Sequence, residues 1–332
     1  MLWLDRMEKQ AILIVGIPPS VFRHFLMKIY YTLDDLEQDG LPTEDGISPR
    51  LAVIGHPIMH SKSPQMHQAA LDSAGIRCKY IKIEAQPEEF TQVIELLKSL
   101  DFIGVNVTVP YKSAAAALAE DCDRLVIATG AANTLVFPRD GNPMAAFNTD
   151  GPGFVRAIRE CFSVDIRDLK IVLLGANGGA GTALAHTCAM NRCERLTLVA
   201  RSLEKITPLQ KDLSPFFTDE HRLEGAADRL RTIAMNSPYL EETISDADLI
   251  VNATTLGLKQ TDASPIPSSY IQPHHLVYDL ITHSDSLQQE AREQGARTAD
   301  GLSMLLHQGA LSFERWFGYS PDMQAMRKAL HI

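Results

Sequence analysis

A buried strand that runs into a glycine-rich turn and then into a helix constrains this chain more than any other segment. Residues 170–174 read Lys-Ile-Val-Leu-Leu, and Gly175, Gly178 and Gly181 follow at a GxxGxxG spacing before a helical pattern over 182–191. Glycines permit a tight turn and let backbone N–H groups approach a pyrophosphate at the helix start. A turn without a ligand gives a similar pattern, but the strand–turn–helix context favours dinucleotide binding. The predicted contacts are Gly175, Ala176, Asn177, Gly178, Gly179 and Ala180.

The residues after the next expected strand, 195–200, bear on which dinucleotide binds. An acidic residue there would hydrogen-bond the ribose 2′-hydroxyl of NAD. Here Arg201 and Ser202 follow the strand, and Lys205 stands one turn later. An arginine suits a 2′-phosphate, so the pattern favours NADP, with NAD as the alternative cofactor. The competing interpretation is that both cations are solvated surface residues.

The alternation of strands and helices extends over the chain from Leu51 onward. Short apolar runs bounded by turn residues predict strands, and longer amphipathic runs predict helices between them. This order predicts parallel strands with helical crossovers, and therefore an α/β fold. The expected strands are 51–55, 80–83, 104–109, 170–174, 195–200, 249–252 and 276–280. The expected helices are 64–74, 88–100, 113–120, 154–161, 182–191 and those that follow about residue 302.

Residues 1–49 have a different character. Asp34–Asp45 is acidic and contains glycine and proline, so it is interpreted as a linker. Val21–Leu33 fits a short amphipathic helix, and Met7 is an alternative start. We assign no function to this extension.

Length and charge narrow the class of protein. The 332 residues leave room for roughly two domains. A net charge of −10 argues against a nucleic-acid partner, because phosphate binding needs a basic face. No apolar run reaches the ~18–20 residues of a membrane helix, and the N-terminus lacks the features of a signal peptide. We therefore expect a cytoplasmic protein whose acidic substrate is held by local groups.

Cysteine and histidine give no metal signature. The five cysteines form no CxxC pair, and reduced thiols fit an intracellular protein. Three histidines, His56, His60 and His67, lie close in sequence, but Pro57 and Pro64 prevent a continuous helical face through them. We expect no bound metal.

The segment 104–112, Gly-Val-Asn-Val-Thr-Val-Pro-Tyr-Lys, combines a strand with chemically useful side chains. Its three valines are expected to point one way, while Asn106 and Thr108 point the other. Pro110 is expected to end the strand. Lys112 then stands at the entry to an alanine-rich helix, where a cation is mildly unfavourable. That cost hints at a task other than stability.

Asp150, in Asn148-Thr-Asp-Gly, is the expected partner of Lys112. It precedes a predicted helix, so a plain N-cap is the simplest interpretation. A carboxylate beside an ammonium, both next to a nicotinamide, forms a proton-transfer site. When hydride reaches a carbonyl carbon the oxygen becomes an alkoxide, and Lys112 can supply its proton. Asp150 would hold the lysine and favour its charged form.

The third element is His60-Ser-Lys-Ser-Pro. Ser63 before Pro64 makes a good N-cap followed by proline at the first helical position, and this alone explains the pattern. The functional interpretation adds the hydroxyls of Ser61 and Ser63, with helix N–H groups, as ligands of a substrate carboxylate.

Taken together, these segments resemble the shikimate dehydrogenase family. The matching stretches are Val53-Ile-Gly-His-Pro-Ile-Met-His-Ser-Lys-Ser-Pro, Asn106-Val-Thr-Val-Pro-Tyr-Lys, Gly130-Ala-Ala-Asn-Thr, Asn148-Thr-Asp-Gly, Asn252-Ala-Thr-Thr-Leu-Gly and Asp300-Gly-Leu-Ser-Met-Leu-Leu-His-Gln. The resemblance covers residues 51–332, and six motifs in order are far more specific than any one of them.

The resemblance implies a two-domain α/β fold with a cleft between the domains. Residues 50–150 with 300–332 would form the substrate-binding catalytic domain, and residues 151–299 a Rossmann-type NADP-binding domain. The implied reaction is the reversible reduction of 3-dehydroshikimate to shikimate with NADPH, in the chorismate pathway of aromatic amino-acid biosynthesis. We expect a monomer or a homodimer.

The resemblance also implies roles for single residues. Lys112 and Asp150 would be the catalytic pair, and Ser61 and Ser63 would hold the substrate carboxylate. Four residues would bond substrate hydroxyls or support that shell: Asn106, Thr108, Asn133 and Gln308. Three would lie near the cofactor: Asn252, Ala253 and Thr254.

Three departures from the family pattern leave alternatives open. Asn177 lengthens the glycine turn, Thr282 stands where the family usually has a tyrosine in a loop that also looks shortened, and Phe147 replaces a commonly polar residue. One alternative is a paralogue that oxidises quinate, shikimate or an amino analogue with NAD or NADP. Another is a catalytically silent ligand-binding regulator, which the intact pair of Lys112 and Asp150 argues against.

Overall fold

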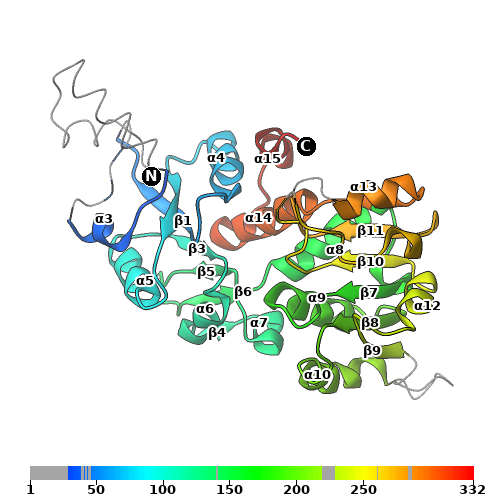
Figure 1. Cartoon of the computed structure of the whole chain (residues 1–332). Helices are drawn as coiled ribbons and strands as arrows, with labels where there is room; N and C mark the ends of the chain where they lie inside the picture. The colour runs from blue at the N-terminus through cyan, green and yellow to red at the C-terminus, as the bar shows by residue number, and fades with distance from the viewer. Residues whose placement is uncertain are drawn as a thin grey trace.

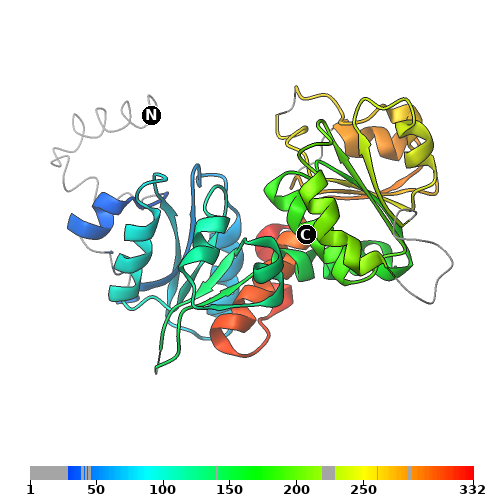
Figure 2. The same ribbon diagram turned by 90° about the horizontal axis from the view of Figure 1, so that it is seen from below.

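The computed structural model describes residues 29–38, 41, 43, 46–139, 141–218, 229–259, 261–282 and 286–332. Two six-stranded sheets stand side by side, each covered by helices (Figures 1 and 2). Among the described residues, no helix has the length and apolar character needed to span a bilayer. Residues 21–28 of the expected helix Val21–Leu33 lie outside the described residues, and residues 29–32 are not helical, so the expectation is wrong for that part.

The first sheet contains the strands β1 (Pro49–Gly55), β2 (Lys79–Glu84), β3 (Gly104–Val107), β4 (Asp121–Cys122), β5 (Thr134–Val136) and β6 (Ala145–Phe147). Their order is β2-β1-β3-β5-β6-β4. β1, β2 and β3 are parallel, but β5 runs antiparallel to both β3 and β6, so the expectation of purely parallel pairing is wrong here. The connection 137–144 between β5 and β6 is too short for the crossover that parallel strands need.

The second sheet contains β7 (Lys170–Leu174), β8 (Arg195–Ala200), β9 (Leu230–Ala234), β10 (Leu249–Asn252), β11 (Leu276–Asp279) and β12 (Arg297–Ala299). All pairs are parallel, and the order is β12-β11-β10-β7-β8-β9. Counted from β7, this is the 3-2-1-4-5-6 order of dinucleotide-binding sheets. The predicted Rossmann-type unit is therefore confirmed. Its order reverses between β7 and β10, where such sheets bind their ligands.

Helices cover both faces of each sheet. The first sheet lies between α5 (Phe90–Ser99) with α6 (Lys112–Leu118) and α7 (Arg124–Thr129) on one face, and α4 (Ser63–Ser73), α14 (Leu302–Phe317) and α15 (Met323–Leu330) on the other. The second lies between α8 (Asp150–Phe162), α9 (Gly179–Met190) and α10 (Thr207–Phe217) on one face, and α12 (Leu240–Ser245) and α13 (Ser286–Glu293) on the other. Short 3₁₀ turns occupy Ile166–Asp168 and Ser268–Tyr270.

Two helices join the sheets. α8 leaves the first sheet after β6 and packs into the core of the second, and α14 lies alongside it in the centre of the molecule (Figure 1). At one end of α14, the Ser303 hydroxyl lies 3.1 Å from the Tyr278 hydroxyl of β11. At the other, Trp316 donates its indole N–H to the Leu135 carbonyl of β5 at 3.1 Å. α14 therefore contacts both sheets.

The end of β3 differs from the expected pattern. Val105 and Val107 are buried, but Val109 is 67% exposed, so the expectation of three valines on one face is wrong. The strand ends at Val107 because the chain turns there, and the Tyr111 N–H donates to the Thr108 carbonyl at 2.9 Å. This turn delivers Lys112 to the start of α6.

Residues before β1 are not only a linker. α3 (Leu33–Gln38) lies at the start of the expected linker, and Leu33 and Leu36 are buried in the core that α5 covers. Asp35 accepts the backbone N–H of Thr32 at 3.0 Å and so caps this helix. Tyr31 bridges to Ile83 of β2 in parallel fashion. The segment 31–38 therefore belongs to the edge of the first sheet.

Candidate active site

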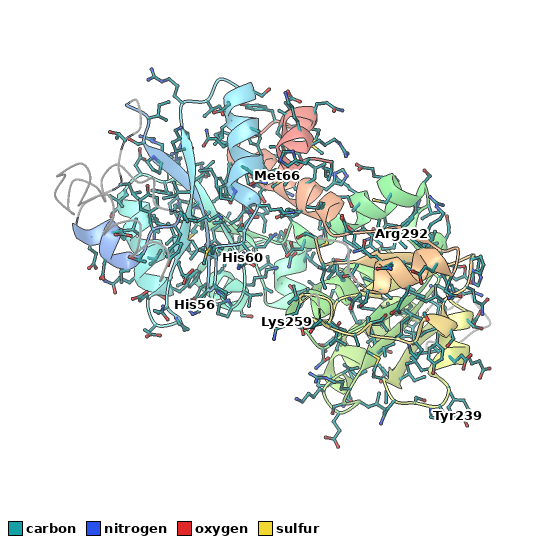
Figure 3. All side chains as sticks on the ribbon, turned by 45° about the horizontal axis from the view of Figure 1, so that its top comes forward. His56, His60, Met66, Tyr239, Lys259 and Arg292 are labelled. Carbon is teal, nitrogen blue, oxygen red and sulfur yellow. The ribbon has the colours of Figure 1, made fainter. Side chains whose placement is uncertain are left out.

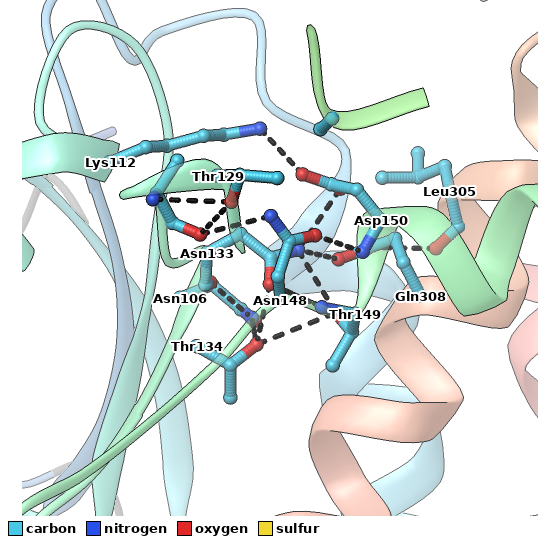
Figure 4. A network of polar contacts seen from close by, with 12 residues as sticks. Asn106, Lys112, Thr129, Asn133, Thr134, Asn148, Thr149, Asp150, Leu305 and Gln308 are labelled. Carbon is cyan, nitrogen blue, oxygen red and sulfur yellow. Dashed lines mark hydrogen bonds and ion pairs between the residues drawn. The ribbon is translucent and has the colours of Figure 1, made fainter. Parts of the chain in front are cut away.

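Lys112 and Asp150 form an ion pair where the first sheet meets α8. Lys112 is the first residue of α6 and Asp150 the first of α8, and Nζ lies 2.6 Å from Oδ2 (Figure 4). The two side chains are 25% and 15% exposed, so the pair stays accessible to a ligand. The N-cap interpretation of Asp150 is wrong, because Thr149 occupies the N-cap and no side chain caps this helix.

The antiparallel pairing of β5 with β6 brings the rest of the site together. Thr134 pairs with Phe147, so the residues just before β5 and just after β6 are neighbours. Asn133 Oδ1 accordingly accepts the backbone N–H of Thr149 at 2.8 Å. The strand direction that the sequence did not predict is thus what places Asn133 beside Asp150.

Asn133 links the ion pair to α14. Its Nδ2 lies 3.0 Å from Asp150 Oδ1, 2.9 Å from Thr149 Oγ1 and 3.2 Å from Gln308 Oε1. Gln308 in turn donates to the Leu305 carbonyl at 2.8 Å. Asn133 is 3% exposed and Gln308 is 8% exposed. Asp150 therefore has one oxygen on Lys112 and the other on a buried amide, which fixes its orientation.

Asn106 lies beneath Asn133 and is engaged at both ends of its amide. Its Oδ1 accepts the Tyr80 hydroxyl at 2.7 Å. Its Nδ2 lies within hydrogen-bond distance of the Asn133 carbonyl, Thr134 Oγ1 and Ser312 Oγ. These contacts suit a supporting role better than direct contact with a substrate. Thr108, the residue after the end of β3, is half-buried, and its backbone N–H donates to the Ile54 carbonyl at 2.9 Å.

Ser61 and Ser63 lie at the start of α4, at the same edge of the first sheet as Lys112. β1 and β3 are adjacent parallel strands, so the segments after their carboxyl ends lie together. The N-cap expectation for Ser63 is wrong: Ser63 is the first helical residue, and Lys62 occupies the N-cap without a side-chain bond. Ser63 donates its N–H to Ser61 Oγ at 3.3 Å. Its own hydroxyl makes no hydrogen bond within the described ranges and is available to a ligand.

The glycine turn fits a pyrophosphate. Gly175 has a φ of +79°, which glycine adopts without strain. A Cβ on Gly181 would lie 2.3 Å from the Gly175 carbonyl oxygen, so only glycine allows this approach of helix to turn. Gly178 is the N-cap of α9 without a side-chain cap, and a Cβ on Gly179 would meet nothing within 4 Å. The start of α9 is therefore exposed, and no side chain blocks the approach of a pyrophosphate to it.

Asn177, which departs from the family's glycine turn, is an exposed residue of that turn. Ala176 is fully buried, and the exposed residues are Asn177, Gly178, Gly179 and Ala180. The N–H groups of Gly175 and Ala176 bond the Val199 carbonyl near the end of β8, at 3.0 and 3.2 Å. Arg201 and Lys205, just beyond that strand, are exposed, and Ser202 is half-buried. Free cations beside the turn suit a phosphate on the adenosine ribose.

Asn252 supports the opposite side of the turn. It is fully buried, and its Nδ2 donates to Asp279 Oδ2 at 2.9 Å. Its Oδ1 accepts the Thr254 hydroxyl at 2.7 Å and the Thr254 N–H at 3.0 Å. A Cβ on Gly175 would lie 3.0 Å from the Ala253 carbonyl oxygen, so the two loops touch. Ala253 and Thr254 are half-buried where their loop touches the glycine turn. The buried Asn252 side chain holds this loop through its bonds to Thr254.

Phe147 and Thr282, two of the three departures from the family pattern, can now be located in the structure. The ring of Phe147 lies under the guanidinium of Arg315, 4.5 Å from its centroid, so this residue packs against α14 rather than facing a ligand. Thr282 is half-buried after β11. Residues 283–285, which follow it, lie outside the described residues.

Sequence reasoning missed the hydroxyl residues that connect these amides. Thr134, Thr149 and Ser312 are buried, and the Thr134 and Ser312 hydroxyls lie 2.8 Å apart. The first two stand inside recognised motifs, and Ser312 lies four residues after Gln308 on the same helical face. Tyr80 gave no signal, because an aromatic residue in a predicted strand is ordinary core.

Comparisons with known proteins agree with this geometry. Residues 53–135 match the shikimate dehydrogenase substrate binding domain, and residues 301–331 match the shikimate 5'-dehydrogenase C-terminal domain. A shikimate dehydrogenase (NADP(+)) from Methanopyrus kandleri is 34% identical over 84% of this chain and 94% of its own length.

Solved structures show the same similarity. A shikimate 5-dehydrogenase from Thermus thermophilus, in complex with NADP(H) and shikimate, is 30% identical and has a TM-score of 0.72 over 85% of this chain and 98% of its own. A quinate dehydrogenase from Corynebacterium glutamicum, in complex with NAD, is 25% identical and has a TM-score of 0.73 over 85% and 98%.

Proposed function

Because the chain belongs to the shikimate dehydrogenase family, we propose that it reversibly reduces 3-dehydroshikimate to shikimate with NADPH. It is an NADP-dependent oxidoreductase of the chorismate pathway. The observation that carries this function is the 2.6 Å contact of Lys112 with Asp150, held by a buried amide network. A catalytically silent regulator has no need of this arrangement.

In this proposal the unit of the first sheet binds the substrate and the unit of the second sheet binds the cofactor. Residues 50–150 with 300–332 form the substrate-binding unit, since Ser61, Asn133 and Gln308 all come from them. Residues 151–299 bind NADP through the glycine turn and Arg201. The exposed start of α9 and the exposed Arg201 support this division, because they offer donors to a pyrophosphate and to a 2′-phosphate.

Lys112 and Asp150 move the proton. NADPH, which the glycine turn and Arg201 would hold, would supply the hydride to the carbonyl carbon, and NADP⁺ would accept it in the reverse direction. The Lys112 ammonium donates a proton to the oxygen that gains negative charge, and the neutral amine takes a hydroxyl proton back in the oxidation. Asp150 stabilises the ammonium, and Asn133 holds Asp150 so that the pair keeps its geometry as the charge changes.

The substrate carboxylate lies at the start of α4. The hydroxyls of Ser61 and Ser63 bind it, with help from the first amides of that helix. Thr108 and Gln308 contact ring hydroxyls, whereas Asn106 and Asn133 hold the surrounding side chains. The open hydroxyl of Ser63 and the ion pair of Lys112, at one edge of the first sheet, support this orientation.

The second candidate is oxidation of quinate, with NAD or NADP. Thr282 favours it, because a tyrosine that usually contacts substrate in this family is replaced there. The similarity to a quinate dehydrogenase in complex with NAD also favours this candidate. Arg201 favours NADP, and the paired Ser61 and Ser63 favour shikimate and thus the first candidate.

Initial rates separate the candidates. Purified protein is mixed with shikimate or quinate and with NADP or NAD, and the absorbance of reduced nicotinamide is followed. We expect the highest kcat/KM with shikimate and NADP. Turnover with quinate only, or with NAD only, would move the protein to the second candidate, and no turnover in any pairing would contradict both.

We also propose a cytoplasmic location and a monomer or homodimer. All five cysteines are free, as expected in a reducing compartment.

A further inference from the structure

A buried histidine lies under the substrate-binding shell and has no part in the mechanism above. His67 lies on α4, one helical turn after Ser63 and on the same face, and is 0% exposed. Its ring stacks on Tyr80 with centroids 4.6 Å apart and an angle of 6°, and Trp316 lies 5.3 Å away. Within the described part of the chain, neither ring nitrogen has a hydrogen-bond partner.

Stability does not explain a histidine at this position. A buried polar atom without a partner destabilises a fold, and a phenylalanine of similar size would stack on Tyr80 without that cost. Burial lowers the pKa of His67 to about 3, and a weaker interaction of the ring with the Asn106 side chain raises it. The ring is therefore neutral near pH 7. The Asn106 amide lies next to the ring, although the contact does not have the geometry of a hydrogen bond.

The first set of contacts leads from His67 to the ion pair. The stacked Tyr80 donates its hydroxyl to Asn106 Oδ1 at 2.7 Å, which fixes which way that amide faces. Asn106 Nδ2 lies 3.1 Å from the Asn133 carbonyl, and Asn133 Nδ2 lies 3.0 Å from Asp150 Oδ1. A displacement of the His67 ring would therefore be transmitted to Asp150 through Asn106 and Asn133.

The second set of contacts leads to α14. A Cβ on Gly309 would lie 3.3 Å from His67 Nε2 and 2.2 Å from Met66 Cε, so α14 packs directly on this part of α4. Figure 3 shows Met66 on α4 beside α14. On the opposite side, a Cβ on Gly153 of α8 would lie 2.9 Å from the backbone nitrogen of Gln308. The backbone that carries Gln308 is thus held between α8 and the His67 turn.

We propose that His67 is a positioning residue, whose imidazole, stacked on Tyr80 and packed against Gly309, sets the orientation of Asn106 and thereby the geometry of Asn133 and Asp150. It touches none of the reacting atoms and acts on Asn106 in two ways, through the stacked Tyr80 and through the ring's own interaction with the Asn106 side chain. The proposal rests on the proposed function, because its effect is measured on shikimate oxidation.

The test combines kinetics with thermal unfolding of His67→Phe. Phenylalanine keeps the stacked ring but loses the interaction of the imidazole with the Asn106 side chain. We therefore expect kcat for shikimate oxidation to fall about tenfold while the KM for shikimate stays within about twofold. We expect Tm to stay the same or to rise, because two unpartnered nitrogens are removed. A spacer that only fills volume would leave kcat unchanged, so wild-type kcat in His67→Phe overturns the proposal.

Tyr80→Phe tests the route. It removes the hydroxyl that bonds Asn106 but keeps the stacked ring, so its kcat is expected to fall by a similar factor. The double variant His67→Phe/Tyr80→Phe is expected to be no slower than the slower single variant, because both act through Asn106. If the kcat losses of the two single variants multiply in the double variant, His67 and Tyr80 do not act through the same amide and the proposed route is wrong. Wild-type kcat in Tyr80→Phe also contradicts the route, and this test does not need His67→Phe to fold.

His275→Phe is the matched control. His275 is 0% exposed, and its Nε2 also lacks a partner among the described residues, but it stands beside β11 on the second sheet. We expect a change in Tm and no change in kcat. Wild-type turnover is measured first: if the unmodified protein does not oxidise shikimate, the proposed function fails and the positioning role with it. Wild-type turnover with an unchanged His67→Phe contradicts only the positioning role.

Discussion

The substrate side and the cofactor side of the candidate site differ in how far their polar groups are already bonded within the chain. On the substrate side, Asn106, Asn133 and Asp150 are buried or half-buried and bond one another or their neighbours. On the cofactor side, Arg201 is exposed and Gly179 borders open space. The substrate side is prearranged, whereas the cofactor side offers backbone amides and long cations.

The difference follows from what each side does. Proton transfer depends on distances of a few tenths of an ångström, so its groups need fixed partners. Phosphate binding depends on charge and on backbone donors, which glycines expose without side-chain networks. Changes on the substrate side should therefore alter kcat, and stability where buried groups are involved, whereas changes on the cofactor side should alter the KM for NADP.

The largest expected effect belongs to Lys112→Ala. Loss of the proton donor should lower kcat for shikimate oxidation about a thousandfold, while the KM for NADP stays within about twofold. Initial rates from nicotinamide absorbance measure both. Lys205→Ala, an exposed lysine on the cofactor side, is the matched control and should keep its kcat. A loss of less than about tenfold in Lys112→Ala would remove the lysine from the mechanism.

Asn133→Ala should disturb both activity and fold. The change removes a buried amide and leaves Asp150 Oδ1 and the Thr149 N–H without their partner, so the free energy of unfolding should fall by about 2 kcal/mol. We expect kcat to fall about tenfold, because Asp150 is no longer held. Urea unfolding and initial rates measure the two effects. Asn177→Ala, which is exposed, should leave stability unchanged, and a stable Asn133→Ala would show that the network is not prearranged.

Two glycines in one turn should respond differently to alanine. Gly181→Ala should lower the free energy of unfolding by about 2 kcal/mol, because its Cβ would lie 2.3 Å from the Gly175 carbonyl oxygen. Gly179→Ala meets open space, so its stability should change by less than about 0.5 kcal/mol. Its new methyl group lies where the pyrophosphate is expected, so the KM for NADP should rise. Equal stability of the two variants would contradict the turn geometry.

The smallest effect is expected for Arg201→Ala. We expect the KM for NADP to rise about tenfold, with kcat, Tm and the KM for NAD unchanged, because only NADP carries the 2′-phosphate. Added salt should narrow the difference from the wild type, since the interaction is exposed. An equal loss with NAD and NADP would exclude a 2′-phosphate contact.

The second sheet was predicted from sequence more fully than the first. β7, β8 and β10 have the expected bounds, because each is a continuous apolar run between turn residues. β4, β5 and β6 were missed, since two or three residues show no periodicity and the antiparallel direction of β5 depends on partners far along the chain. β9 and β12, the two edge strands of the second sheet, were missed as well.

The residues of the candidate site were also predicted only in part. Lys112 was singled out because a cation at a helix start is unfavourable, and Asp150 because a carboxylate beside an ammonium forms a proton-transfer site. The structure brings the two side chains within 2.6 Å. His67 was considered only as one of three histidines close in sequence, and Tyr80 and Ser312 gave no signal, because a buried side chain in a regular element resembles ordinary core. Their contacts arise only when α4, β2 and α14 pack together.

The most direct test of the division between a prearranged chemical side and an open binding side is a double-mutant cycle between Asn133→Ala and Arg201→Ala. The quantity measured is kcat/KM for NADP with saturating shikimate. If the two sides act independently, the losses multiply, and the double variant lies within about threefold of their product. A departure of more than about tenfold from the product would show that Arg201 and the amide network act as one unit, and would contradict the account.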